Sequence, residues 1–248
     1  MSLVQRVRHQ WYRTRRPTTP PLPAPRAEHA VLTSIEEWRA ARAEARTLGL
    51  PPHPDPPKSW DTLHALRTIV ARVPPAGRIL DAGAERYSTL LTSLERYGYR
   101  DLHGLNLVFD KIESVGAITY YPGDATRTPW ADGWFDAITC LSVIEHGVDV
   151  DAFFAEAARL LRPGGVLSIS TDYWPTPTDT GGRVAYGAPI KIFDRTELAG
   201  WVARAARVGL APSIPLEPTL AFEPRERPVM WRRYDLRYTF AIMTLIRS

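Results

Sequence analysis

From Gly77 onward, short apolar runs alternate with longer stretches of helical spacing, and this alternation most constrains how the chain folds. Isolated runs of that length predict buried strands, and helices between them predict βαβ units in a parallel sheet. We therefore expect an α/β fold with a doubly wound, mostly parallel sheet and helices on both faces. The expected strands are residues 78–82, 101–107, 118–121, 135–141, 166–171 and 238–246, and the expected helices are residues 89–97, 150–161 and 196–208.

The first part of the chain differs from the rest in composition. Prolines are dense at residues 16–25 and again at residues 51–57, which disfavours packed structure there. The expected organisation is a basic, proline-rich N-terminal extension with one helix at residues 1–57, followed by one domain at residues 58–248.

Two helices are expected before the first strand. The segment from Ser34 to Leu48 is rich in alanine, arginine and glutamate, and Gly49 ends it. A second helix is expected at residues 62–72, with Asp61 as its N-cap.

Composition narrows the class of protein. The 248 residues, 44% of them hydrophobic, suffice for one sizeable core. Cys140 is the only cysteine, which excludes an intrachain disulfide and a cysteine-rich metal site, and no metal-ligand spacing is evident. The chain has no signal-peptide pattern and no run of about 18 apolar residues, so we expect a cytoplasmic protein without membrane insertion. The net charge of +4, with five arginines at residues 6–16, does not require a nucleic-acid partner.

Polar side chains follow the expected strands, where ligands bind in an open doubly wound sheet. Gly83 allows a tight turn and a close backbone approach, while Asp81 can accept hydrogen bonds from its loop or from a cationic amine. Asn106 can bind a ribose hydroxyl, and Asp124 can accept a hydrogen bond from an adenine amino group. Purely structural roles, a strand-end cap for Asp81 and a Gly-Asp turn for Asp124, remain open.

The loop after the fourth strand is the expected catalytic loop. It runs from Leu141 to His146 and places polar groups at the mouth of the crevice. His146 can accept a proton from a hydroxyl acceptor, because the ordinary pKa of histidine lies near 6.5. Glu145 and His146 equally fit a polar cap that opens the next helix.

Five motifs follow one another along this region. They are Ile79-Leu80-Asp81-Ala82-Gly83, Gly123-Asp124-Ala125, Trp134-Phe135-Asp136-Ala137-Ile138, Val143-Ile144-Glu145-His146 and Leu161-Arg162-Pro163-Gly164-Gly165. In this order and spacing, residues 77–210 resemble the class I S-adenosylmethionine-dependent methyltransferases of the small-molecule type, in the branch with a generic methyltransferase domain.

The resemblance implies a Rossmann-like sheet of seven strands and S-adenosylmethionine as the methyl donor. It implies methyl transfer to an oxygen, nitrogen or carbon of a small-molecule or saccharide acceptor, and a homodimer is compatible with it. It further implies His146 and Glu145 as catalytic residues. The cofactor-binding residues that it implies are Asp81, Gly83, Ala84, Asn106, Asp124, Ala125, Leu141 and Ser142.

Two departures from the family pattern lead to a second hypothesis. Glu85, Arg86 and Tyr87 stand where the family usually has further glycines, so side chains enter the cofactor loop. Asn106 stands where the family usually has an acidic residue that accepts hydrogen bonds from both ribose hydroxyls. The alternative is therefore a methyltransferase-like binding or scaffold protein without turnover. A nicotinamide-dependent oxidoreductase fits poorly, since no Gly-x-Gly-x-x-Gly follows the first strand.

The connection after the fifth strand is the expected acceptor side. Aromatic and basic side chains are concentrated there, at Tyr173, Trp174, Tyr186, Lys191 and Phe193. We expect these residues to contact the acceptor, and residues 176–189 either close over a substrate or form a surface loop. Arg225, Arg227, Arg232 and Arg233 fit either an anionic acceptor or a solvated face.

Overall fold

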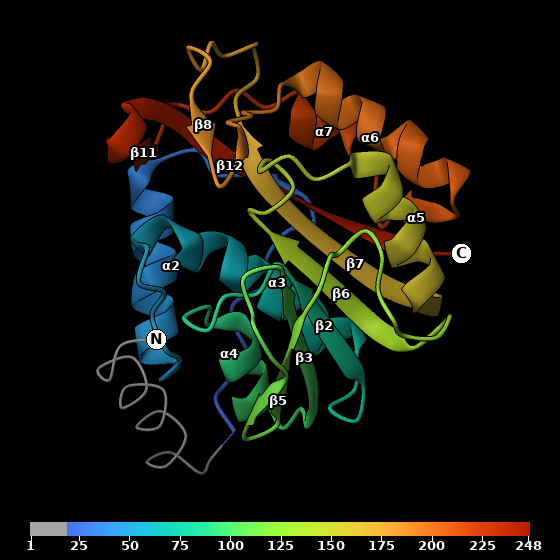
Figure 1. Cartoon of the computed structure of the whole chain (residues 1–248). Helices are drawn as coiled ribbons and strands as arrows, with labels where there is room; N and C mark the ends of the chain where they lie inside the picture. The colour runs from blue at the N-terminus through green and yellow to red at the C-terminus, as the bar shows by residue number, and fades with distance from the viewer. Residues whose placement is uncertain (1–18) are drawn as a thin grey trace.

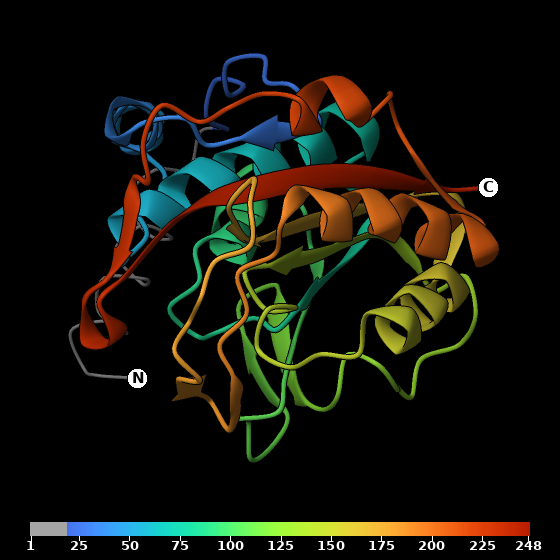
Figure 2. The same ribbon diagram turned by 90° about the horizontal axis from the view of Figure 1, so that it is seen from above.

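A computed structural model describes residues 19–248, which form one mixed sheet between two layers of helices (Figures 1 and 2). The five arginines at residues 6–16 lie outside the described residues. The strands of the sheet are β1 (Ala30–Val31), β2 (Arg78–Ala82), β3 (Asp101–Asn106), β4 (Glu113–Val115), β5 (Ile118–Pro122), β6 (Phe135–Leu141), β7 (Leu161–Tyr173), β10 (Leu210–Pro212), β11 (Val229–Trp231) and β12 (Leu236–Arg247). The helices are α2 (Ile35–Thr47), α3 (Ser59–Arg72), α4 (Leu90–Arg96), α5 (Val150–Leu160), α6 (Arg195–Arg207) and α7 (Glu217–Leu220), with single 3₁₀ turns η1 (Pro56–Lys58) and η2 (Arg232–Tyr234).

The strand order confirms the predicted doubly wound, Rossmann-like sheet. Strands β5, β3, β2, β6 and β7 are parallel neighbours in that order, β12 runs antiparallel to β7, and β10 pairs antiparallel with β12. Six of these seven strands correspond to the strands predicted from the sequence pattern, and β10 supplies the seventh that the family resemblance implies. The sheet also carries β1, β4 and β11, which the sequence pattern did not predict because runs of two or three residues have no readable periodicity.

The segment before η1 is joined to the main sheet. Ala30 pairs with Ile242 and Val31 with Ala241, which adds β1 antiparallel to β12. Leu32 is fully buried, and α2 packs against α3. Part of the predicted extension thus belongs structurally to the sheet, and the boundary at residue 58 stays a prediction.

Two apolar layers enclose the sheet, one on each face. Helices α2, α3 and α4 cover the first face, where Leu66 and Ile69 share a core with Ile79. Helices α5 and α6 cover the second, where Phe153 and Trp201 share a core with Leu80 (Figure 2). Since successive strand residues point to opposite faces, the neighbours Ile79 and Leu80 supply one residue to each layer.

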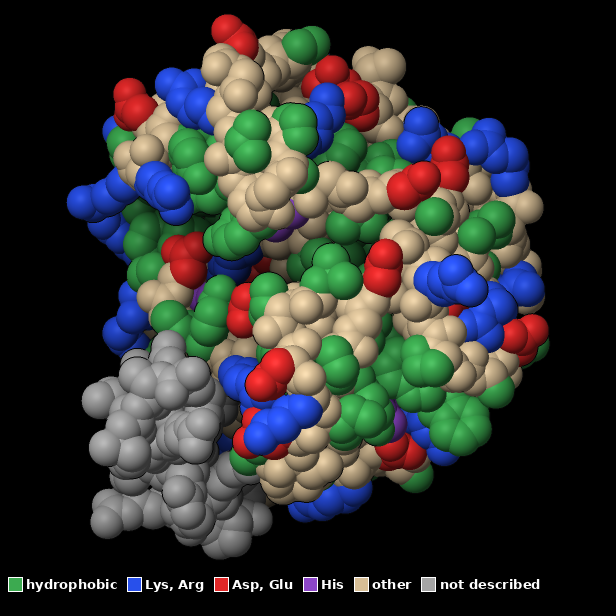
Figure 3. Space-filling view, in the orientation of Figure 1, with side chains coloured by type: hydrophobic (Ala, Val, Ile, Leu, Met, Phe, Trp, Pro, Cys, Tyr) green, Lys and Arg blue, Asp and Glu red, His purple; other side chains and the backbone are tan. Residues whose placement is uncertain are grey.

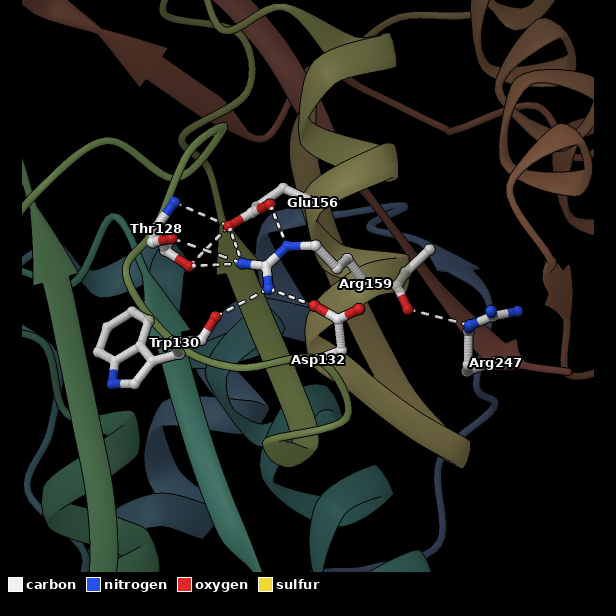
Figure 4. Close-up of polar contacts among 7 residues, drawn as sticks. Thr128, Trp130, Asp132, Glu156, Arg159 and Arg247 are labelled. Atoms are coloured by element: carbon white, nitrogen blue, oxygen red, sulfur yellow. Dashed lines mark hydrogen bonds and ion pairs between the residues drawn. The ribbon is translucent and has the colours of Figure 1, made fainter.

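An ion network fixes α5 against the connection between β5 and β6 (Figure 4). The guanidinium of Arg159 donates to Glu156 at 2.7 and 2.9 Å, to Asp132 at 2.7 Å and to the backbone carbonyl of Trp130 at 2.8 Å. Glu156 in turn accepts hydrogen bonds from the backbone and hydroxyl of Thr128. The network positions the loop that leads into β6.

Candidate cofactor site

The carboxyl ends of β2 and β6 meet at one edge of the sheet, where the strand order reverses. Asp81 in β2 is in register with Thr139 in β6 and with Gly104 in β3. A cavity of about 190 Å³ opens there, and it is lined by residues of both strand ends, of α3 and of the segment before it. Figure 3 shows this face hollowed near its centre, with acidic, basic and histidine side chains at the wall. The place agrees with the ligand-binding crevice of doubly wound sheets.

Gly83 makes the turn that closes the cavity floor. Its φ of +87° is left-handed, and its amide donates to the carbonyl of Leu105 at 2.7 Å. A Cβ at this position would lie 2.3 Å from Val143 Cγ2. Only glycine therefore fits here, because both the backbone conformation and the approach of the β6 loop exclude a side chain.

Asp81 lines the cavity from the end of β2. It is buried, and one carboxylate oxygen accepts a hydrogen bond from the Thr139 hydroxyl at 2.7 Å. Burial raises the pKa of Asp81 to about 7. The negative charge of the nearby Asp61 also raises this pKa, while the hydrogen bond from Thr139 lowers it. A cationic ligand in the cavity would favour the ionised form of Asp81.

Asp61 is not the N-cap that the sequence pattern predicted. Helix α3 begins at Ser59, so Asp61 lies in its first turn and its carboxylate turns into the protein. It accepts a hydrogen bond from the Ser170 hydroxyl at 2.8 Å and one from the backbone of Thr62 at 2.7 Å. The prediction was wrong because Pro56 and Pro57 open η1, which runs directly into α3.

Lys58 is the only lysine or arginine among the described residues that line this cavity. Burial of its ammonium lowers the pKa, but the carboxylates of Asp61 and Glu145 outweigh burial, and the pKa is raised. The ammonium is therefore charged at neutral pH. The cavity also has carboxylates at Asp55, Asp61, Asp81 and Glu85, so both signs of charge meet in it.

The three side chains that follow the Gly83 turn, those of Glu85, Arg86 and Tyr87, do not all point the same way. Glu85 and Tyr87 line the cavity. Arg86 turns away, forms an ion pair with Glu113 and lies 5.1 Å from the ring centroid of Phe109. Ala84 is buried beside Gly104.

Asn106 supports the cofactor loop from the end of β3. Its side-chain amide donates to the carbonyls of Gly83 and Ala84 at 3.2 and 3.0 Å, and its Oδ1 accepts from the amide of Val108 at 3.1 Å. These contacts use both ends of the side chain. The role of Asn106 in binding a ribose stays a prediction.

Asp124 and Ala125 lie outside the residues that line the cavity. The Asp124 carboxylate accepts hydrogen bonds from the amide and the hydroxyl of Thr126, both at 2.8 Å, which is the pattern of an Asx turn. Ala125 packs against the core of the second face. Their contact with an adenine stays a prediction.

Leu141 and Ser142 line the cavity from the end of β6. Ser142 has a left-handed φ of +52°, which is uncommon for a residue other than glycine. Its amide donates to the Ser170 carbonyl at 3.0 Å. Backbone conformations of this kind cluster at functional sites.

Glu145 is buried behind the cavity, outside its lining. It accepts a hydrogen bond from the Thr171 hydroxyl at 3.1 Å and faces the carboxyl of Asp172. Burial raises the pKa of both carboxyls, and the charge of Glu145 raises that of Asp172 further. This arrangement fits an electrostatic role beside Lys58, and the catalytic role of Glu145 stays a prediction.

His146 contacts two aromatic side chains, Tyr186 and Trp231. Its ring centroid is 4.8 Å from that of Tyr186 and 6.0 Å from that of Trp231. Burial, with a contribution from the Lys58 charge, lowers its pKa to about 4. The imidazole is therefore neutral at pH 7 and a weak base, which leaves its catalytic role a prediction.

The expected acceptor residues separate in the fold. Tyr173 and Phe193 are buried in the core. The guanidinium of Arg227 lies 4.2 Å from the ring centroid of Trp174. Lys191 forms an ion pair with Glu197. Tyr186 alone of the five lines the cavity. The sequence pattern missed Lys58, His53 and Asp55, since they precede the first predicted strand in a proline-rich stretch without periodicity.

Residues 80–169 match a family model described as a methyltransferase domain. This segment of the chain carries a methyltransferase domain. The matched segment contains the Gly83 turn and the loop from Leu141 to His146, while Lys58 and Asp61 lie before it and Tyr186 after it.

Two curated proteins are similar in sequence to parts of the chain, and one solved structure is similar in fold to the whole chain. A demethylmenaquinone methyltransferase of Mycolicibacterium vanbaalenii is 48% identical over 54 residues, which is 22% of this chain and 24% of that protein. A ubiquinone biosynthesis O-methyltransferase of Xanthomonas oryzae pv. oryzae is 33% identical over 138 residues, 45% of this chain and 55% of that protein. The chain thus matches about half the length of these relatives, or less.

The fold is shared with geranyl diphosphate C-methyltransferase from Streptomyces coelicolor, solved with Mg²⁺, geranyl diphosphate and S-adenosyl-L-homocysteine. The TM-score is 0.56 at 15% identity, over 100% of this chain and 99% of that one. Across residues 19–248 of the present protein, no helix has the length and apolarity to cross a bilayer. Within the same residues, histidine, cysteine and acidic side chains form no group suited to a metal ion.

Proposed function

We propose that the protein transfers the methyl group of S-adenosylmethionine to an oxygen, nitrogen or carbon of a small-molecule or saccharide acceptor and releases S-adenosylhomocysteine. The observation that supports the proposal is that Lys58, Asp61 and Asp81 line one cavity at the carboxyl ends of β2 and β6. The methionine part of the donor bears a carboxylate, an ammonium and a sulfonium. A site for it needs both signs of charge in a small space.

The residues present fit this part of the donor. Lys58 would bind its carboxylate, and Asp81 would accept a hydrogen bond from its ammonium. Gly83 leaves room for the backbone of the loop to approach the ligand. The raised pKa of Asp81 supports this assignment, because the bound cation compensates the cost of ionising a buried carboxyl.

When bound, the donor supplies an electrophilic methyl group on a sulfonium. The part of the chain is chiefly to hold donor and acceptor in line and to exclude water. A strong base is unnecessary where the acceptor is already nucleophilic, which agrees with the low pKa of His146. The proposed place of action is the cytoplasm, where the buried, unpaired Cys140 stays reduced.

Calorimetric titration with S-adenosylmethionine and S-adenosylhomocysteine tests the proposal. We expect micromolar binding of both, with affinity reduced at least about tenfold in Lys58→Met, because a charge-assisted hydrogen bond is lost. Lys111→Met is the matched control, since Lys111 is exposed and lies outside the cavity. Absence of binding to either ligand would overturn the proposal and favour the scaffold hypothesis.

A further inference from the structure

Two tyrosines stand at the mouth of the cavity, on segments far apart in the sequence. Tyr87 belongs to the loop after β2, and Tyr186 to the turn between β8 (Val184–Ala185) and β9 (Ala188–Pro189). Both line the cavity, yet Tyr87 is 37% and Tyr186 is 79% exposed. Large aromatic side chains left in solvent beside a cavity are typical of a surface that a ligand covers.

Each tyrosine is supported by a histidine ring on its own side of the mouth. His53 lies edge-on to Tyr87 with centroids 6.0 Å apart, and His146 lies 4.8 Å from Tyr186. Trp231 stacks with Tyr186 at 6.3 Å and an interplanar angle of 26°. These ring contacts give each tyrosine a neighbour to pack against at the mouth.

The backbone around Tyr186 is held in an unfavourable conformation. Tyr186 has φ of +52° and Gly187 has φ of +82°, the two left-handed positions of a tight hairpin turn that usually takes Asn-Gly or Asp-Gly. A bulky residue is costly at the first of these positions. The backbone conformation of the turn therefore does not explain why a tyrosine occupies this position.

The hairpin that carries Tyr186 is seated on the loop after β6. A Cβ on Gly147 would lie 2.6 Å from Ala188 Cβ, so the two segments touch closely. Figure 1 shows the hairpin above the carboxyl ends of β6 and β7. This contact keeps Tyr186 over the cavity that Tyr87 borders from the other loop.

We propose that Tyr87 and Tyr186 form an aromatic clamp that binds the methyl acceptor as a flat, conjugated ring without negative charge. The inference rests on the proposed function and names its substrate class. Flat rings gain from contact with two phenol rings, and offset or edge contacts of this kind are favourable beyond the buried area. A negative charge is disfavoured because Asp55 and Glu85 also line the cavity.

The test compares two probes of the same carbon skeleton, 2-naphthol and its saturated analogue decahydro-2-naphthol. Each is titrated onto protein loaded with S-adenosylhomocysteine, with naphthol fluorescence and calorimetry as readouts. We expect 2-naphthol to bind about tenfold tighter than the saturated alcohol. We further expect Tyr186→Ala to lose about tenfold in 2-naphthol affinity, and Tyr186→Phe to keep it.

Affinity for S-adenosylhomocysteine is measured separately in each variant. Tyr186→Ala should retain it within about threefold, because the ring stands at the mouth and the donor residues lie deeper. If S-adenosylhomocysteine does not bind, the proposed function fails, and the same probe titrations on the free protein still decide the clamp. Equal affinity for the two probes, or unchanged 2-naphthol affinity in Tyr186→Ala, overturns the clamp.

Discussion

The side-chain amide of Asn106 donates to the backbone carbonyl of Ala84 at 3.0 Å, which ties the end of β3 to the cofactor loop. A second hydrogen bond from the same amide reaches the carbonyl of Gly83. Glu85, Arg86 and Tyr87 replace the family's further glycines in this loop. The loop is held by hydrogen bonds that the Asn106 amide donates, at a position where the family usually has an acidic side chain that accepts hydrogen bonds.

Asn106→Asp tests this relationship. A carboxylate in place of the amide would face two carbonyl oxygens, so we expect the unfolding free energy to fall by about 1–3 kcal/mol and the affinity for S-adenosylhomocysteine to fall about tenfold or more. Urea unfolding and calorimetry measure the two effects. If Asn106 instead served a ribose, the acidic variant would bind the ligand as well as the native protein or better.

Gly83→Ala should damage the site through the Cβ that it adds. The contact with Val143 and the left-handed backbone together predict a loss of about 1–3 kcal/mol in unfolding free energy, and a displaced loop that binds the donor poorly. Gly182→Ala is the matched control, because Gly182 has φ of +65° with no atom within 4 Å of the added Cβ. Thermal and urea unfolding of both variants separate the steric cost from the backbone cost. Equal losses would show that the approach of Val143 is unimportant.

The ionisation of Asp81 should make stability depend on pH. Burial raises its pKa to about 7 in the folded chain from an ordinary value of 3.8, so the folded chain holds this proton more tightly than the unfolded one. This contribution to stability is full below about pH 4 and is lost as the pH rises through about 7, by an amount on the order of 1–4 kcal/mol.

Asp81→Asn should remove that part of the pH dependence. Urea unfolding at pH 5 and at pH 8, without ligand, gives the change in unfolding free energy between the two pH values for the native protein and for the variant. Glu145 and Asp172 also have raised pKa values and remain in both proteins, so only the change between the two is attributed to Asp81. The same difference in both proteins would contradict the assignment.

Arg159→Met should destabilise α5 and its contact with the loop before β6 (Figure 4). The variant leaves the Glu156 carboxylate without its guanidinium partner, and we expect a loss of about 1–2 kcal/mol, since Arg159 is partly exposed. Arg207→Met is the control, because the Arg207 pair with Asp151 is at the surface and should contribute less than about 1 kcal/mol.

The same variant should alter acid unfolding. Burial raises the pKa of Glu156, but hydrogen bonds from Arg159 and Thr128 outweigh burial and lower it. The contribution of Glu156 to stability is therefore present above its ordinary pKa of 4.5 and lost as the pH falls below it. The urea concentration at the unfolding midpoint should therefore vary less with pH, between pH 3 and pH 6, in Arg159→Met than in the native protein.

Local sequence patterns determined the framework of the domain. Strands β2 and β6 have the predicted bounds, because each is a short apolar run next to a polar turn. The bounds of β7 differ from the predicted 166–171, since residues 161–165 also belong to the strand and its register with β6 shifts there. Parallel strands end at one edge of the sheet, so Asp81, Gly83, Leu141 and Ser142 were placed together by the fold class alone.

The tertiary structure decided what else enters the cavity. Lys58 and Asp61 come from a proline-bounded turn and the helix after it, and Tyr186 from a hairpin after the last parallel strand, segments whose sequence carries no period that relates them to β2. Asn106 was found by its position at a strand end, but the direction of its amide was set by the carbonyls of Gly83 and Ala84. Periodicity reports which face of an element is buried, whereas the partner of a polar side chain depends on distances between segments remote in sequence, and those exist only in the folded chain.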